Sequence, residues 1–525
     1  MKKTNKILAI ILAILMVTSI IPITVSAADP TSGTCGENAT WTYDGETYTL
    51  TISGSGEMND YNISNRPWES YERKIKAVVI DDGITTIGEY AFRFCVYLAN
   101  VSLPSTLTSI GSFAFEQCGL ENIDIPDSVT SIGFRAFYSC DNLKSVEIPE
   151  GVEKIEAYAF EYCSSLEEVI LHEGLKTIDY YAFANCKELT SIEFPSTLTY
   201  IGSWAFEDTG ITNITIPASV TSFGSGVFTE CPNLTDVTFA DGTKSISAEI
   251  FSWCPVLKNV NIPNTVETIN SAAFYGCFAL KNVYFDGTVE DWLKITFANV
   301  EAQPLYYADN LYCQDELVTE VVVPENITTI NAFAFCDYDK LTSVKISSTV
   351  KTINKNAFAD CSGLTNLVIE EGVTSIGNSA FEECYVLESV SLPQNLTTLD
   401  QAAFKDCTIM ESVELPDSLT RLSRELFQGC TKLSQVKLPA KLEFIDYLAF
   451  ADCTSLNHVF FPKTLIDAAS WNGYANYGIF YGCTALTDVV LEEGMTIVAP
   501  YLFCGAPAIE TVTIPETEVS ATGGD

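Results

Sequence analysis

The residue type with the greatest chemical potential in this chain is cysteine, which occurs eighteen times. Fifteen cysteines recur at one place in an internal repeat of about 23 residues: Cys95, Cys118, Cys140, Cys163, Cys186, Cys231, Cys254, Cys277, Cys336, Cys361, Cys384, Cys407, Cys430, Cys453 and Cys483. Stacked repeats would align these thiols in a column with parallel Cα–Cβ bonds, whereas a disulfide needs two Cβ atoms that converge to about 3.8 Å. We therefore expect buried, unpaired thiols. Disulfides between alternate turns and a metal site are the alternatives, although no Cys-x-x-Cys or Cys/His spacing favours a metal. Cys35, Cys313 and Cys504 lie outside the column and are the better candidates for pairing or reactivity.

Residues suited to catalysis are few. The two histidines, His172 and His458, accompany no distinctive serine or cysteine nucleophile motif, so we do not expect a general base at either. A glycosidase needs two carboxylates across a cleft, and among 68 acidic residues the sequence singles out no pair. Residues 54–57 lack the third glycine of a dinucleotide-binding loop. The sequence therefore predicts a protein that is not an enzyme and uses no cofactor or metal, with a hydrolase as the least favoured alternative.

The repeat itself must position these residues, and residues 128–151 are a typical copy. Leu143, Val146 and Ile148 alternate with polar residues, as in a short strand with one buried face, and Pro149 ends the strand. Nineteen such strand segments accompany seventeen Ala-Phe pairs, in some of which Val, Ile or Leu replaces Ala. Repeats of this length with one strand each are typical of leucine-rich repeats, which stack because no unit buries its own apolar face. The predicted fold is an α/β leucine-rich-repeat solenoid with one parallel sheet of about 19 short strands, about 85 Å long.

The phenylalanine of each Ala-Phe pair is the largest recurring apolar residue. We expect these rings to fill the core on the convex side of the solenoid. The first five are Phe92, Phe115, Phe137, Phe160 and Phe183. The Ala-Phe-x-x-Cys segment is too short for a stable isolated helix, so it should form a single helical or 3₁₀ turn held by packing.

The concave strand face is the surface with the most freedom to vary. Of the two residues that flank each central valine and point outward, the first is polar throughout, whereas the second varies and is more often apolar from Tyr284 onward. The candidate ligand-binding residues on this face and in the insertion are Tyr284, Trp292, Tyr306, Tyr307, Lys345, Lys437, His458 and Phe460. Few aromatic residues are expected on the strand face, which favours a protein partner over a polysaccharide. A merely solvated face is the alternative.

Segments outside the repeat complete the domain organisation: signal peptide 1–27, N-terminal β cap 28–74, repeats 75–285, insertion 286–317, repeats 318–515 and disordered tail 516–525. The cap should contain two short strands joined by a glycine turn and cover the first apolar turn; a separate binding module is the alternative. The insertion should contain a short helix at 289–295, and it either packs on the solenoid or protrudes as a binding loop. A second, smaller insertion is predicted at 466–478.

The N-terminus and the charge balance predict export. Lys2, Lys3 and Lys6 precede an apolar run at 7–23 and small residues at 25–27, as in a cleaved signal peptide; an uncleaved membrane anchor is the alternative. The net charge is −40, and removal of the signal lysines leaves 25 of 28 basic residues against 68 acidic ones, about −43. Such a surface repels nucleic acids and anionic lipids, so we expect no nucleic-acid partner and no membrane insertion of the mature chain. The predicted location is extracellular or at the cell surface.

The repeat, in the form Leu-x-x-Val-x-Ile-Pro, Ser-x-Thr-x-Ile-Gly, Ala-Phe-x-x-Cys, resembles that of the BspA-like bacterial leucine-rich-repeat surface proteins. Cys-Gly at 35–36, the strand at 50–56 and Pro-Trp at 67–68 are similar to the segment before the repeats in many of them, so the resemblance covers 35–515. It implies an elongated surface protein that adheres to extracellular proteins such as fibronectin or fibrinogen, without catalytic residues. The main hypothesis is an adhesin-like protein that binds an extracellular protein or polysaccharide; the alternative is a non-catalytic surface spacer.

Overall fold

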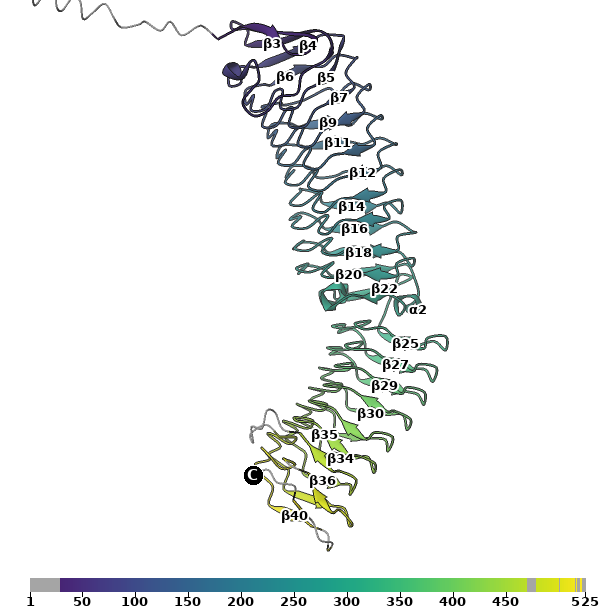
Figure 1. Ribbon diagram of the computed structural model, residues 1–525. Helices are drawn as coiled ribbons and strands as arrows, with labels where there is room; N and C mark the ends of the chain where they lie inside the picture. The colour runs from purple at the N-terminus through teal and green to yellow at the C-terminus, as the bar shows by residue number, and fades with distance from the viewer. Residues whose placement is uncertain (1–28, 470–477, 500, 515, 517–519, 522–525) are drawn as a thin grey trace, which may run out of the picture.

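The computed structural model describes residues 29–469, 478–499, 501–514, 516 and 520–521. Figure 1 shows a long, curved solenoid in which successive turns of the chain lie one on another from the N-terminal to the C-terminal end. The predicted fold is confirmed: the chain is a parallel β-solenoid of about 19 turns with little helix. The predicted signal peptide and most of the second insertion and of the tail lie outside the described residues.

Most turns contribute a strand to a main ladder and a shorter strand to a second ladder. The main ladder comprises β4 (Ala77–Ile80), β6 (Asn100–Ser102), β9 (Ser145–Glu147), β11 (Glu168–Ile170), β14 (Asn213–Ile216), β16 (Asp236–Phe239), β18 (Asn259–Ile262), β20 (Asn282–Phe285), β22 (Asn310–Cys313), β24 (Glu320–Val322), β26 (Ser343–Ile346), β28 (Asn366–Ile369), β30 (Ser389–Ser391), β32 (Ser412–Glu414), β34 (Gln435–Lys437), β36 (His458–Phe461), β38 (Asp488–Leu491) and β40 (Thr511–Thr513). The second comprises β5 (Ile84–Ile87), β7 (Ser109–Ile110), β8 (Ser131–Ile132), β10 (Lys154–Ile155), β12 (Thr177–Ile178), β13 (Tyr200–Ile201), β15 (Ser222–Phe223), β17 (Ser245–Ile246), β19 (Thr268–Ile269), β21 (Thr296–Phe297), β25 (Thr329–Ile330), β27 (Thr352–Ile353), β29 (Ser375–Ile376), β31 (Thr398–Leu399), β33 (Arg421–Leu422), β35 (Phe444–Ile445), β37 (Asp467–Ala468), β39 (Ile497–Val498) and β41 (Ser520–Ala521).

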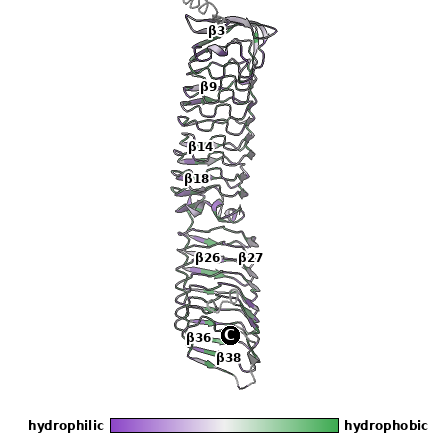
Figure 2. Ribbon diagram, turned by 60° about the vertical axis from the view of Figure 1, so that its left-hand side comes forward, coloured by the Kyte–Doolittle hydropathy of each residue, from purple (hydrophilic) through white to green (hydrophobic). Residues whose placement is uncertain are grey.

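Neighbouring strands within these ladders run parallel and pair residues from the same place in the repeat. Side chains of one kind therefore align in columns along the solenoid. Because successive side chains of a strand point to opposite faces, one face of the main ladder is apolar and buried while the other meets solvent. Figure 2 shows both hydrophilic and hydrophobic residues within single strands, β26 among them.

The Ala-Phe-x-x-Cys segment forms turns in place of the predicted helical turn. The N–H of Tyr138 donates to the carbonyl of Arg135 within the turn, whereas the N–H of Phe137 donates to the carbonyl of Ala159 in the next turn, 2.8 Å away. Arg135 and Ser139 have left-handed backbones, each with a φ of 54°, which allows successive amides to point in alternate directions. A helix would direct every amide along its own axis, so the bonds between turns exclude it.

The phenylalanine column is confirmed as the centre of the core. Phe92, Phe115, Phe137, Phe160 and Phe183 are all fully buried. Adjacent rings stack: Phe115 and Phe160 lie on either side of Phe137 with centroid separations of 5.4 and 5.2 Å. Each turn therefore completes the apolar contacts of its neighbours, as expected of a repeat that buries no core alone.

The cysteine column also matches the prediction, because all eighteen thiols are unpaired. The thiol of Cys163 donates to the carbonyl of Phe137 in the preceding turn at 3.2 Å, and Cys140 and Cys186 donate in the same way to the carbonyls of Phe115 and Phe160. Burial raises the pKa of Cys140 to about 12, so these thiols are not nucleophiles at neutral pH. They act instead as small core residues with a weak hydrogen-bond donor.

Two of the three cysteines outside the column do not have the expected reactivity. Cys35 and Cys313 are buried, and burial raises the pKa of Cys35 to about 11 and that of Cys313 to about 12. Cys504 is partly exposed, and burial raises its pKa as well. A buried thiol with a raised pKa is both protonated and inaccessible, which removes the reason for singling out Cys35 and Cys313.

The N-terminal segment has three strands where two were predicted: β1 (Ser32–Thr34), β2 (Asn38–Asp44) and β3 (Thr49–Glu57). β2 pairs antiparallel with both β1 and β3, and β3 then pairs in parallel with both β4 and β5, so this segment enters both ladders. The 3₁₀ turn η1 (Glu69–Tyr71) follows. Next to it, the indole N–H of Trp68 donates to the carbonyl of Ala91 at 2.8 Å. In the following turns the equivalent alanine carbonyl accepts instead from a backbone N–H of the preceding turn, as Ala114 does from Phe92.

The insertion at 286–317 lies within the stack as an additional turn. It contains α2 (Val289–Trp292), the 3₁₀ turns η2 (Val300–Ala302) and η3 (Pro304–Tyr306), and β23 (Glu316–Leu317). Its β21 continues the second ladder and its β22 the main ladder, each pairing in parallel with the preceding turn. The helix falls inside the predicted range, and the insertion packs on the solenoid instead of protruding.

The main ladder is divided after β23, and side chains join the two parts. The indole N–H of Trp292 donates to the carbonyl of Ala334 at 2.8 Å, and the side-chain amide of Gln303 donates to the same carbonyl at 2.9 Å. The hydroxyl of Tyr338 accepts from the N–H of Leu311 at 3.2 Å. The Trp292, Gln303 and Tyr338 side chains are fully buried. We call this region, 286–338, the joint. Trp292 thus caps the second part of the stack as Trp68 caps the first.

Candidate binding surface

The outward side of the main ladder begins with a polar column that is largely bonded to itself. Asn259 donates to Asp236 at 2.7 Å, Asn282 donates to Asn259 at 2.8 Å, and Asn310 donates to Asn282 at 2.9 Å. Such a ladder of amides stabilises the stacking of turns. It leaves fewer free donors and acceptors for a ligand than the sequence suggests.

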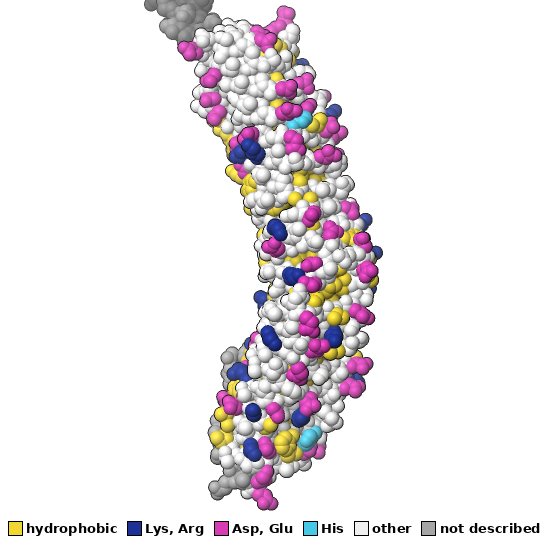
Figure 3. Space-filling view, turned by 90° about the vertical axis from the view of Figure 1, so that its right-hand side faces the viewer, with side chains coloured by type: hydrophobic (Ala, Val, Ile, Leu, Met, Phe, Trp, Pro, Cys, Tyr) yellow, Lys and Arg dark blue, Asp and Glu magenta, His cyan; other side chains and the backbone are white. Residues whose placement is uncertain are grey.

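The neighbouring column carries an apolar cluster across the joint. Tyr284 pairs with Tyr312 in the ladder, and their rings stack at 5.0 Å. Farther along the chain, the Val322 residue is 65% exposed, and Leu317 and Val368 are also exposed. We call Tyr284, Tyr312, Leu317, Val322 and Val368 the central patch. Figure 3 shows apolar side chains gathered near the middle of one side of the molecule, among carboxylates that extend along its whole length.

Tyr312 is the residue that sequence reasoning missed. It lies in β22, inside a segment that the repeat pattern excludes because Leu311 replaces the usual valine and no proline follows. The available signal was the match between Asn310 and Tyr312 and the preceding strand, where Asn282 and Tyr284 have the same spacing. Aligning these two pairs would have placed Tyr312 on the outer face.

The candidate cations of the strand face are engaged in ion pairs. Lys345, between Val322 and Val368 in the ladder, lies 2.9 Å from a carboxylate oxygen of Glu370. Lys437 pairs with Glu414 one turn earlier. Exposed ion pairs of this kind contribute little to stability, so a partner with complementary charge could replace them.

His458 and Phe460 lie together on β36, near the C-terminal end of the described solenoid. The Nδ1 atom of His458 lies 2.8 Å from Asp488 Oδ2 on the next strand, and the Phe460 side chain is exposed. The other histidine, His172, lies 2.8 Å from Glu147. Both imidazoles therefore have a carboxylate partner, and His458 and Phe460 are separate from the central patch.

The insertion residues fall into two groups. Trp292 is fully buried against Ala334 and cannot contact a ligand, so its assignment as a binding residue is wrong. Its indole instead occupies the core because the joint requires a large apolar side chain that also carries a donor. Tyr306 is exposed and Tyr307 partly buried, and both lie with other aromatic residues at the Ala-Phe-x-x-Cys turns.

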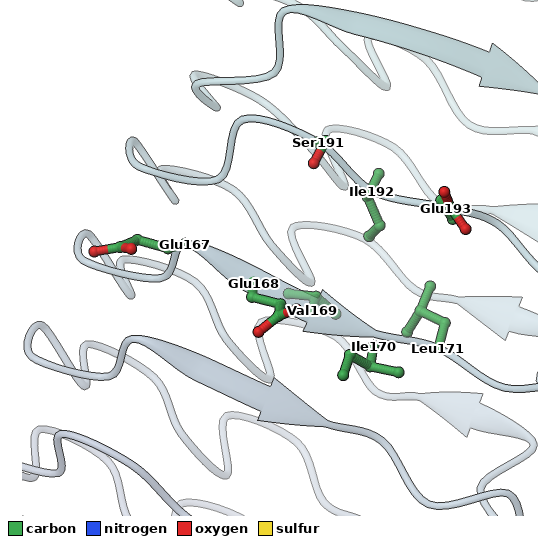
Figure 4. Close-up of a pocket in the computed structure, with 8 residues that line it drawn as sticks. All are labelled: Glu167, Glu168, Val169, Ile170, Leu171, Ser191, Ile192 and Glu193. Atoms are coloured by element: carbon green, nitrogen blue, oxygen red, sulfur yellow. The ribbon is translucent and has the colours of Figure 1, made fainter.

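An open cavity of about 270 Å³ lies on the main ladder near its first third. Figure 4 shows Glu168, Ile170 and Glu193 among its lining residues, from two successive turns. The ladder is interrupted there, because residues 189–195 form no strand. The cavity is therefore a gap between turns, lined by carboxylates, Ser191 and aliphatic side chains.

Glu161 is an isolated acid in the core beside the phenylalanine column. It is only 6% exposed, and its Oε2 atom has no hydrogen-bond partner among the described residues. Burial raises its pKa to about 7; Arg135 opposes this shift and Glu207 adds to it. The folded chain therefore holds this carboxyl protonated over a pH range in which the unfolded chain ionises it.

Replacement of Glu161 with glutamine should stabilise the protein at pH 8 and have little effect at pH 5. With the pKa raised on folding, wild-type stability from this group is full below about pH 4.5 and is lost as the pH rises toward about 7. At pH 8 the glutamine removes an ionised buried carboxylate, a gain of about 1 to 3 kcal/mol. Urea denaturation of both proteins at the two pH values measures this; the same difference at both would contradict it.

The stacked turns, the main ladder and the aligned phenylalanine and cysteine columns define a leucine-rich-repeat solenoid. More narrowly, the chain belongs to the family described as the BspA type leucine rich repeat region, whose model matches residues 62–190, 176–303, 307–433, 351–473 and 401–523. Proteins of this family are repeat proteins that are typically non-catalytic, and the family suggests a protein-binding or cell-surface role.

Several solved structures are similar to this chain. A leucine-rich repeat protein from Bacteroides ovatus is 26% identical, with a TM-score of 0.45, over 69% of this chain and 94% of that one. A leucine rich cell surface protein from Faecalibacterium prausnitzii is 24% identical, with a TM-score of 0.33, over 78% of this chain and 94% of that one. No curated protein matches the sequence. Within the described residues, no helix has the length and apolar character needed to cross a membrane.

Proposed function

We propose that this protein is exported and acts at the cell surface as a binding protein that recognises an extracellular protein through the central patch. The observation that carries the proposal is the apolar cluster of Tyr284, Tyr312, Val322 and Val368 on a ladder face where a polar column runs beside it. Exposed apolar clusters rimmed by polar residues are typical of protein-binding sites. The predicted signal peptide and the family's surface role support the location.

The arrangement of the patch favours a protein over a polysaccharide. The rings of Tyr284 and Tyr312 are only 15° from parallel and lie 5.0 Å apart, so each covers one face of the other. A sugar stacks on a free aromatic face, whereas the aliphatic side chains of a protein pack well against ring edges and valines. Lys345, which lies between Val322 and Val368 in the ladder, and its partner Glu370 add polar groups beside the apolar side chains, as protein interfaces do.

The test is binding of the protein to a panel of purified extracellular-matrix proteins and glycans, followed by substitution in the patch. Val322→Glu and Val368→Glu place a charge in the apolar contact and should weaken binding by about tenfold or more. Thr215→Glu is the matched control, because Thr215 is exposed in the same column on β14. Absence of binding to every member of the panel, or equal effects of Thr215→Glu and Val322→Glu on binding, would contradict the proposal.

A further inference from the structure

A second group of exposed side chains lies away from the strand face, at the Ala-Phe-x-x-Cys turns that precede the insertion and in the insertion itself. Trp253 is 47% exposed, Phe278 is 66% exposed and Tyr306 is 43% exposed. Tyr275 and Tyr307 complete the group, which we call the aromatic ridge. The ring of Trp253 contacts those of Tyr275 and Phe278 at 5.4 and 5.9 Å, and Phe278 contacts Tyr307 at 5.7 Å.

The ridge is continuous and presents ring faces to solvent. Tyr307 contacts Tyr306 at 4.8 Å, with the two rings 89° apart, and the other contacts are also edge-on. In an edge-on pair the face of one ring is not covered by its neighbour. The hydroxyl of Tyr307 accepts from the N–H of Gly276 at 3.0 Å, which fixes the insertion's part of the ridge to the preceding turn. The ridge is therefore held in place by the fold, and its aromatic side chains remain partly exposed to solvent.

An acidic pocket begins where the ridge ends. A cavity of about 380 Å³ is lined by Tyr306 on one side and by Asp337, Asp360, Glu382 and Glu383 from three successive turns on the other. Phe333 adds an apolar wall. Tyr306 thus belongs to both features, so a ligand in the pocket can also contact the ridge.

The pocket has an excess of negative charge. Glu382 pairs with Lys405 at 2.7 Å, but the carboxylates of Asp337, Asp360 and Glu383 have no basic partner within the described residues. The pKa of Asp337 is raised to about 6, chiefly by burial, with a hydrogen bond from Cys336 opposing the shift and the neighbouring Asp360 and Glu383 carboxylates adding to it. Crowded carboxylates of this kind repel one another, so a cation entering the pocket relieves the repulsion.

An organic cation fits this pocket better than a metal ion. The three carboxylates close enough to share a metal are Glu382, Glu383 and Asp406, and the ammonium group of Lys405 already lies 2.7 Å from Glu382 and 3.8 Å from Asp406. The hydroxyl of Tyr385 donates to Glu383. The acids that line the 380 Å³ cavity also include Asp337 and Asp360 and so extend over three turns, as suits a side chain with a long apolar stem and a charged head.

We propose that the aromatic ridge and the acidic pocket form a docking site for an extended basic segment of another protein. A lysine or arginine of that segment enters the pocket between Tyr306 and the Asp337 and Asp360 carboxylates, and its apolar side chains pack on Trp253 and Phe278. The charge of the chain, −40 overall, favours such a partner and speeds its association. This site is separate from the central patch and does not depend on the function proposed for it.

The test measures binding of a fluorescent nonapeptide in which lysine and leucine alternate, using the full chain without residues 1–27. The double variant Asp337→Asn with Asp360→Asn should weaken binding about tenfold, because two carboxylates that face the cation lose their charge. Phe278→Ser should weaken it about fivefold through loss of the apolar contact. Phe278 is mostly exposed, so this second variant keeps the core intact.

Matched controls separate a specific site from diffuse attraction. Glu168→Gln with Glu193→Gln removes the same charge from the exposed main ladder, and Tyr97→Ser removes an equally exposed ring; both should change affinity by less than about twofold. Lack of binding, equal weakening by site and control variants, or equal binding of a glutamate–leucine peptide would overturn the proposal. So would displacement of the peptide by cellohexaose, since the site would then be a carbohydrate site. Loss of binding through Val322→Glu alone would place the peptide on the central patch.

Discussion

Replacement of Trp292 with alanine is expected to destabilise the protein by about 3 to 5 kcal/mol, as for other large buried aromatic residues. The Trp292 side chain is fully buried, packs against Phe285 and Phe297 at centroid distances of 5.3 and 5.6 Å, and donates to the carbonyl of Ala334. Because the main ladder is divided at the joint, few backbone bonds replace what this side chain provides. The expected result is a lower denaturant midpoint together with faster proteolysis around Gln314.

Conservative substitutions separate the two contributions of Trp292. Trp292→Phe keeps most of the apolar volume but loses the indole donor. Loss of this hydrogen bond should lower the free energy of unfolding by about 1 kcal/mol beyond the effect of the smaller side chain. The loss is no larger because Gln303 still donates to the Ala334 carbonyl. Trp68→Phe is the matched control at the N-terminal end, where Trp68 makes the equivalent bond to Ala91. If Trp292→Ala left the midpoint and the proteolysis rate unchanged, the two parts of the stack would be stable without the joint.

The periodic part of this architecture could be predicted because the same residue types recur at the same spacing in each repeat. Phe137 and Cys140 recur with fixed spacing, and a column of large apolar side chains with a column of thiols beside it packs best in the core of a stack. The turn conformation between them could not be predicted. The left-handed backbones of Arg135 and Ser139 arise from hydrogen bonds to the next turn, a tertiary effect that overrides local helix propensity.

The candidate surface could be predicted only in part. Tyr284 and Lys345 were placed correctly on the outer face, because strand alternation fixes which side chains point outward. In the insertion no period exists, so nothing in the sequence separates the buried Trp292 from the exposed Tyr306. The aromatic ridge was missed for a related reason: Trp253 adopts a φ of 58°, and this backbone conformation is not apparent from the variable residue before each cysteine.

Replacement of Phe137 with alanine is the second change with a large expected effect, about 3 to 5 kcal/mol. The ring is fully buried between Phe115 and Phe160, so alanine opens a cavity that two neighbouring turns share. Because stability in a solenoid is a sum of intrinsic and nearest-neighbour terms, the loss should be concentrated in the flanking turns. Hydrogen exchange should rise most for the amides of residues 109–161.

The control for Phe137→Ala is Tyr162→Ala, which removes a comparable ring that is exposed on an adjacent turn. That change should cost less than about 0.5 kcal/mol, because the ring contributes little to the core. Uniform acceleration of exchange along the whole chain in Phe137→Ala would contradict the nearest-neighbour account and show that the solenoid unfolds as one unit. Acceleration confined to one side of the joint, with residues 343–461 unchanged, would show instead that Trp292 and Gln303 join two parts that can open independently.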